Sequence, residues 1–110
     1  MDYPTRKEEM VLLAVFRLGR DASLVSIRDY LSQSTRARWS VGNTYVTLDR
    51  LERQKLLESS IGEPEARRGG KAVKSYRLSI HGRLALRELK KVHDVLWAGV
   101  SGLVPKSRKA

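Results

Sequence analysis

Apolar and polar positions follow a helical period in four stretches of the chain, with a strand-like region between the third and the fourth. The first helix is predicted from a capping box at Thr5 to Leu18. The second ends near Gln33, and its alternative N-caps are Asp21, Ser23 and Ser26. The third helix is expected over 40–53 and the fourth over 80–97.

Two short strands are predicted at 57–61 and 73–78, the second of which is rich in β-branched and aromatic residues. The segment between them contains Pro64 and two adjacent glycines, which exclude regular structure. The order of elements predicts a mainly α (α+β) fold, a winged helix-turn-helix. It would consist of a three-helix core, a two-stranded wing and a C-terminal dimerisation helix.

The third helical stretch begins with Ser40, a favourable N-cap, and has two different sides. One side is apolar and is formed by Val41, Tyr45 and Leu48, flanked by Leu51. The other carries amide, hydroxyl and guanidinium groups, on Asn43, Thr47, Arg50 and Gln54. Amide and guanidinium groups pair bidentately with base edges in the DNA major groove. We therefore predict that Asn43, Thr47 and Arg50 read bases, the alternative being an ordinary surface helix with a polar outer face.

The predicted second and third helices are joined by a short polar connection, which makes a helix-turn-helix. We expect Trp39 to pack beneath this turn. A hairpin with a basic tip directly after such a unit is typical of a wing that binds phosphate, although a solvated charged loop is the alternative. The residues expected to contact the DNA backbone are Arg38, Ser40, Thr44, Tyr45, Arg67, Arg68, Lys71 and Lys74.

The first and last helices carry more apolar surface than a small core requires. The first is apolar around nearly its whole circumference, which indicates a core helix with an added interface role. The last has a broad apolar stripe, which packing against a second copy of the chain would cover. The predicted dimer interface consists of Leu12, Phe16, Leu86, Leu89, Val92, Leu96 and Trp97.

The formal net charge of +10 at pH 7 is placed unevenly along the 110 residues. Residues 1–62 carry 10 Lys/Arg against 8 Asp/Glu, whereas residues 63–110 carry 12 against 4. A basic domain of this kind attracts polyanions, nucleic acid first. We expect one domain over 1–98, in which about 79–98 is the dimerisation helix, and a flexible basic tail over 99–110.

The sequence has few of the residues that an enzyme active site or a metal site requires. It has no cysteine, and neither of its two histidines, His81 and His93, has a partner at metal-ligand spacing. No cofactor site or catalytic group is therefore predicted. The chain begins without a signal-peptide pattern and has no apolar run near the roughly 20 residues that cross a bilayer. We expect a cytoplasmic, nucleoid-associated protein without a membrane partner.

Residues 41–57 read Val-Gly-Asn-Thr-Tyr-Val-Thr-Leu-Asp-Arg-Leu-Glu-Arg-Gln-Lys-Leu-Leu, which resembles the recognition-helix signature of the PadR-like transcriptional regulators. The segments 62–64, 68–71 and 76–79, followed by Gly82, match further family motifs in order and spacing. The combination is specific although each piece is not. The short C-terminal part resembles the smaller subgroup of this bacterial family.

The resemblance covers roughly 8–97 and implies a homodimeric winged helix-turn-helix that represses transcription from palindromic operators. It also implies a small aromatic effector near Trp97, the alternative for this residue being dimer core. The chain departs from the family at Ser79, where threonine is usual, and at Lys55, where glycine is usual. Because of the second departure, the sequence does not determine the conformation of the turn after the third helix.

Together these features predict a homodimeric, sequence-specific regulator of transcription that binds double-stranded DNA. The alternative function is a winged-helix interaction module whose basic surface binds an acidic protein partner.

Overall fold

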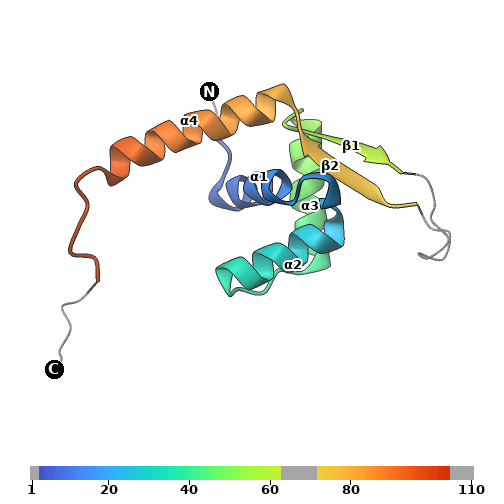
Figure 1. The fold of residues 1–110 in the computed structure, drawn as a ribbon, viewed down its shortest axis with the longest axis horizontal. Helices are drawn as coiled ribbons and strands as arrows, with labels where there is room; N and C mark the ends of the chain where they lie inside the picture. Colours follow the sequence, from blue (N-terminus) through green and yellow to red (C-terminus); the bar gives the residue numbers. More distant parts are fainter. Residues whose placement is uncertain (1–2, 63–71, 105–110) are drawn as a thin grey trace.

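The computed structural model describes residues 3–62 and 72–104 of the chain. Its elements, in chain order, are α1 (Arg6–Leu18), the 3-10 turn η1 (Gly19–Asp21), α2 (Leu24–Thr35), α3 (Val41–Arg53), β1 (Leu57–Ile61), β2 (Lys74–Leu78) and α4 (Ile80–Trp97). This is the predicted order, and the arrangement of three helices, hairpin and long last helix confirms the winged-helix fold class (Figure 1). None of the described helices is long and apolar enough to cross a membrane.

Side-chain caps fix where the helices begin. The capping box of α1 is formed, since the Thr5 N–H donates to Glu8 Oε1 at 2.8 Å and the Glu8 N–H donates to Thr5 Oγ1 at 3.1 Å. Among the three alternatives for α2 the structure selects Ser23, whose Oγ accepts from the N–H of Ser26. Helix α2 continues two residues beyond the predicted end, to Thr35.

The core lies where α1, α2 and α3 meet the hairpin. Its fully buried side chains include Val11, Leu12, Ile27, Leu48 and Leu51. Trp39 is also buried, and its indole Nε1–H donates to Thr35 Oγ1 at the end of α2. The prediction that this tryptophan packs beneath the turn is therefore confirmed.

The hairpin pairs β1 and β2 in antiparallel register, from Leu57 opposite Leu78 to Ile61 opposite Lys74. The second strand starts one residue later than predicted. The hairpin is attached to the helices by an isolated bridge between Ser23 and Ser75. The wing tip, with Arg67, Arg68 and Lys71, lies outside the described residues, as does the end of the basic tail, 105–110.

The turn after α3 holds the start of α4. Lys55 has φ 64°, in the left-handed region that favours glycine, and the turn after α3 forms with this lysine in it. The Ser79 N–H donates to the Leu56 carbonyl at 3.1 Å, and Ser79 Oγ donates to the Lys55 carbonyl at 2.6 Å. A side chain at Gly82 would overlap the Leu56 carbonyl oxygen. From this joint α4 passes beside α1, where His93 contacts Glu9, and its last part extends beyond the three-helix core (Figure 1).

Candidate nucleic-acid interface

The inner side of α3 is formed by two leucines and two threonines. Leu48 and Leu51 are fully buried, as is Thr44, and Thr47 is 5% exposed. Each threonine hydroxyl donates to the carbonyl four residues earlier, from Thr44 to Ser40 at 2.7 Å and from Thr47 to Asn43 at 2.9 Å. With its hydroxyl satisfied in this way, a threonine packs like a small apolar residue.

These positions correct two sequence predictions. Thr47 does not reach a base edge, and Thr44 does not reach a phosphate, because both side chains point into the core. The predicted apolar side of α3 is also wrong in part. Val41 and Tyr45 are 43% and 50% exposed, so the helix is rotated about its axis relative to the prediction.

The outer side of α3 therefore differs from the predicted polar front. In its first half Val41, Asn43, Tyr45 and Val46 are exposed. Ser40 lies at the helix start, where its Oγ accepts from the Asn43 N–H at 3.0 Å. This half combines apolar groups with one amide and the unpaired N–H groups of a helix N-terminus.

Arg50 lies in the second half of α3, and its side chain is 56% exposed. Its Nη1 is 3.6 Å from Oε2 of Glu8, the carboxylate whose other oxygen closes the capping box of α1. Arg50 therefore connects α3 to the N-terminus of α1, while part of its guanidinium remains accessible to solvent. The base-reading roles of Arg50 and Asn43 stay predictions.

A second set of contacts joins α3 to the wing. Glu52 accepts a hydrogen bond from the Ser59 hydroxyl on β1, and its Oε1 lies 3.4 Å from Nζ of Lys74 on β2. The Ser59 hydrogen bond and the nearby Lys74 charge hold the pKa of Glu52 below its usual range. Lys74 Nζ also lies 5.4 Å from the ring centroid of Tyr76. Burial raises the pKa of the Tyr76 phenol.

Lys74 was predicted to bind phosphate, and in the structure it serves as a link between the wing and α3 while remaining half exposed. Sequence spacing gave no signal for this contact, because Glu52 and Lys74 are brought together only by the packing of α3 on the hairpin. Of the other predicted backbone contacts, Arg38 and Ser40 are exposed just before α3, and Tyr45 is exposed on its second turn.

Charge differs between the two halves of α3 and their surroundings. No Asp or Glu occurs from residue 30 to residue 48, where the exposed Arg36 and Arg38 lie. The first carboxylate of the helix is Asp49, whose Oδ2 is 3.1 Å from Nε of Arg53. The positive end of the helix dipole adds to the arginines at the start of α3. The first half of α3 thus suits an anion better than the second.

The residues predicted for a dimer interface lie in different environments. Leu12 is fully buried in the core, and Leu89 is 8% exposed, so their burial in the chain leaves little side-chain surface for a second copy and corrects both assignments. Phe16, Leu96 and Trp97 are 56%, 69% and 58% exposed. Leu86 and Val92 are partly buried.

A pocket of about 440 Å³ lies between α1 and the second half of α4. Its lining includes Leu13 and Leu86, the Trp97 ring, and polar groups of both helices. Glu9 and His93 also line it, with His93 Nε2 3.1 Å from Glu9 Oε2. Trp97 is thus placed beside a hollow and not inside the core of the chain.

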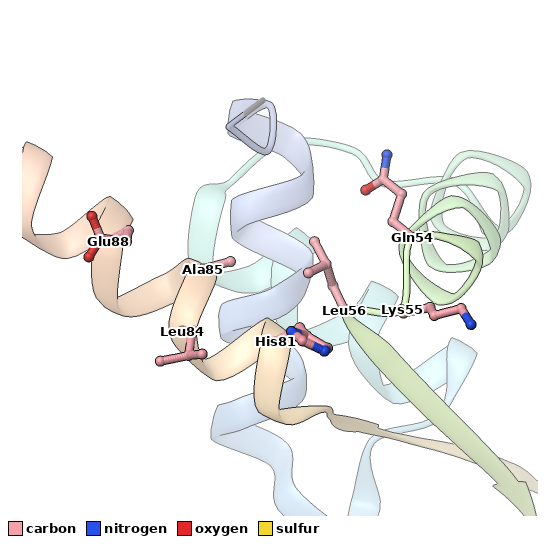
Figure 2. Close-up of a pocket in the computed structure, with 7 residues that line it drawn as sticks. All are labelled: Gln54, Lys55, Leu56, His81, Leu84, Ala85 and Glu88. Atoms are coloured by element: carbon pink, nitrogen blue, oxygen red, sulfur yellow. The ribbon is translucent and has the colours of Figure 1, made fainter. Parts of the chain in front are cut away.

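A second pocket, of about 650 Å³, lies between the end of α3 and the first half of α4 (Figure 2). Leu56 and Ala85 project into the space between these elements, and His81 and Glu88 line it from α4. The sequence did not single out this pocket, since its lining comes from segments far apart in the chain.

No protein-family model and no curated protein matches the chain. Several solved structures are similar. RosR of H. salinarum has a TM-score of 0.69 and 19% sequence identity, over 89% of this chain and 81% of RosR. A PadR family transcriptional regulator from Eggerthella lenta has a TM-score of 0.66 and 27% identity, over 92% of this chain and 86% of that protein.

A third similar structure is that of Bordetella bronchiseptica BpsR, whose DNA binding is regulated by 6-hydroxynicotinic acid. Its TM-score is 0.59 at 22% identity, over 89% of this chain and 68% of BpsR. The Eggerthella protein is a transcriptional regulator and BpsR binds DNA, which agrees with the class of protein that the sequence predicts. The chain thus has the winged-helix fold of transcriptional regulators, and in sequence and structure it is similar to a PadR family member.

Proposed function

We propose that the protein regulates transcription by sequence-specific binding to double-stranded DNA through α3 and the wing. The observation that carries the proposal is the exposed first half of α3, which lies in a stretch without carboxylates, beside Arg36 and Arg38. A helix of this kind next to a β-hairpin fits the shape of a major groove, and its positive charge is complementary to that of the flanking phosphates. The similarity to a PadR family regulator supports it.

Within this proposal Asn43 and Arg50 contact base edges. Both are exposed on α3 and carry the bidentate groups that discriminate bases. The phosphate contacts come from Arg38, Ser40, Tyr45 and Lys74, and from the wing-tip residues Arg67, Arg68 and Lys71. Phosphate contacts position the protein, whereas base contacts select the sequence.

The working form is a homodimer that represses transcription from a palindromic operator. The exposed apolar side chains Phe16, Leu96 and Trp97 support this assembly, because a second copy would remove them from water. In a two-fold dimer the two α3 helices would enter successive major grooves, about 34 Å apart.

A small aromatic effector binds beside Trp97 and relieves repression. The pocket between α1 and α4 supports this proposal, because it offers an indole face, apolar side chains and charged groups at its edge. The regulation of BpsR by an aromatic acid, 6-hydroxynicotinic acid, is a parallel in a similar fold.

Selection from a pool of random duplexes, followed by a mobility-shift measurement at about 0.15 M salt, tests the function. We expect a preferred duplex with two-fold symmetry, and an affinity that falls steeply as salt rises. Failure to enrich any sequence would contradict the proposal. It would favour the interaction module that binds an acidic protein partner.

A further inference from the structure

The first half of α3 exposes three large apolar side chains to solvent. Val41, Tyr45 and Val46 are 43%, 50% and 52% exposed, within six consecutive residues of one short helix. Val46 lies on the side of the helix opposite the buried Leu48 and Leu51. Single exposed apolar residues are common on protein surfaces, but three on one turn and a half of helix indicate a contact.

Gly42 supplies an independent observation on the same side of the helix, one turn before Val46. It is helical and its φ is not positive, and a Cβ built at Gly42 would meet no atom within 4 Å. Neither backbone conformation nor packing in the chain therefore requires a glycine. Alanine would favour the helix, so the missing side chain has a use only if something outside approaches the backbone closely.

The charge around Gly42 indicates what approaches. The stretch 30–48 has no carboxylate, Arg36 and Arg38 are exposed in it, and α3 presents its N-terminus there. A partner that is complementary to this surface is negatively charged and also has apolar groups. On the base edges of the DNA major groove, the apolar feature is the 5-methyl group of thymine.

We infer that α3 enters the major groove with Gly42 and Val46 nearest the base edges, and that the Val46 methyl groups read the methyl group of a thymine. The inference rests on the proposed DNA-binding function and adds a reading residue that hydrogen-bonding patterns do not reveal. Gly42 allows the close approach, and Val46 supplies the contact.

The test exchanges single thymines for uracil in the selected duplex, which removes only the methyl group. For the wild type we expect one thymine in each half-site at which uracil raises the dissociation constant roughly fourfold, the effect of burying one such group. In Val46→Ala the ratio of the uracil to the thymine dissociation constant should fall towards one at that position.

Val25→Ala is the matched control, since Val25 has the same 52% exposure as Val46 but lies on α2. The ratio of the uracil to the thymine dissociation constant should be retained in this variant, even if its overall affinity changes. Gly42→Ala provides the second arm. We expect its melting temperature to equal or exceed that of the wild type, while its affinity for the selected duplex falls on the order of tenfold.

The outcomes separate this inference from the function on which it rests. If selection enriches no duplex, the proposed function fails and the thymine contact with it. If a duplex is enriched but uracil has no effect at any thymine, or keeps its effect in Val46→Ala, the inference is overturned and the proposed function stands. Unchanged affinity in Gly42→Ala would overturn the close approach.

Discussion

The two halves of α3 differ in how they are held. The second half is attached to three parts of the chain: Arg50 contacts Glu8 of α1, Glu52 contacts Ser59 and Lys74 of the hairpin, and the turn at Lys55 is bonded to the start of α4. The outer side of the first half touches little, and the inner sides of both halves fill the core.

One short helix can thus be held rigidly and still expose a surface for binding. Contacts at one end restrict its orientation, so the other end can stay exposed without losing its position. Presenting a surface in a fixed geometry lowers the entropic cost of binding.

Leu51→Ala should show that the inner side of α3 carries its stability. Leu51 is fully buried, and truncating such a leucine costs about 3 kcal/mol in the free energy of unfolding. Val46→Ala, on the outer side, should change this free energy by less than about 0.5 kcal/mol. Urea unfolding followed by circular dichroism measures both. Equal losses in the two variants would contradict the division into inner and outer sides.

Arg50→Ala tests whether Arg50 contacts a base or only joins α3 to Glu8 of α1. If this residue reads a base, the variant should lose about 2 kcal/mol of discrimination between the selected duplex and one changed at a single position. Competition mobility shifts measure this quantity.

The matched control is Glu8→Gln, which removes the ionic partner of Arg50 and keeps the capping box, since glutamine also serves at that position. Sequence preference should survive in this variant. If Arg50→Ala lowers stability and leaves the preference among duplexes unchanged, Arg50 holds α3 against α1 and does not contact a base.

Ser79→Ala tests the attachment between α3 and α4. It removes the cap of Gly82 N–H and the hydrogen bond to the Lys55 carbonyl, and we expect a loss of about 1 kcal/mol in unfolding free energy. Ser79→Thr keeps the hydroxyl and should recover most of it. A Ser79→Ala protein that melts like the wild type would show that packing at Gly82 is sufficient.

Glu52→Gln tests the contact between α3 and the wing through its pH dependence. The pKa of Glu52 is lowered from 4.5 in the folded state, so its stabilising effect is present above that pH and is lost as the pH falls through the folded-state pKa. Melting temperatures of the wild type should fall more steeply than those of Glu52→Gln below about pH 4.5. Because the carboxylate is a third exposed, the difference should stay below about 1 kcal/mol. Parallel pH curves would exclude this role.

Local patterns predicted the elements of the fold well. Ser40 and Ser79 cap α3 and α4 as expected, because a cap depends on residues within one turn of each other. The strands and the buried Trp39 also followed from sequence. Sequence period and caps therefore determine where an element begins and what type it is.

The orientation of α3 was predicted less well, and threonine is the reason. Thr44 and Thr47 were assigned outwards as polar residues, whereas their hydroxyls bond to their own helix and their methyl groups pack inwards. Val41 and Tyr45 were assigned inwards as apolar residues. Which side of α3 faces the core depends on the surfaces of α1 and α2, and those contacts are not encoded within the stretch itself.

Leu12 shows the same limit in α1. A helix that is apolar on all sides gives no periodic signal to separate its core side from its outer side, so Leu12 and Phe16 were placed together. The structure separates them, with Leu12 in the core and Phe16 exposed.

The joint at Lys55, Leu56 and Ser79 has a mechanical consequence. It connects α3 to α4 through one turn, and α4, with 18 residues at about 1.5 Å each, is roughly 27 Å long. Because α4 is rigid, a change in its angle at the far end, where Trp97 lies, is also a change in its angle at the joint. The joint then transmits this rotation to the end of α3. In a dimer formed through α4, the angle between α4 and the rest of each chain would thus set the distance between the two α3 helices.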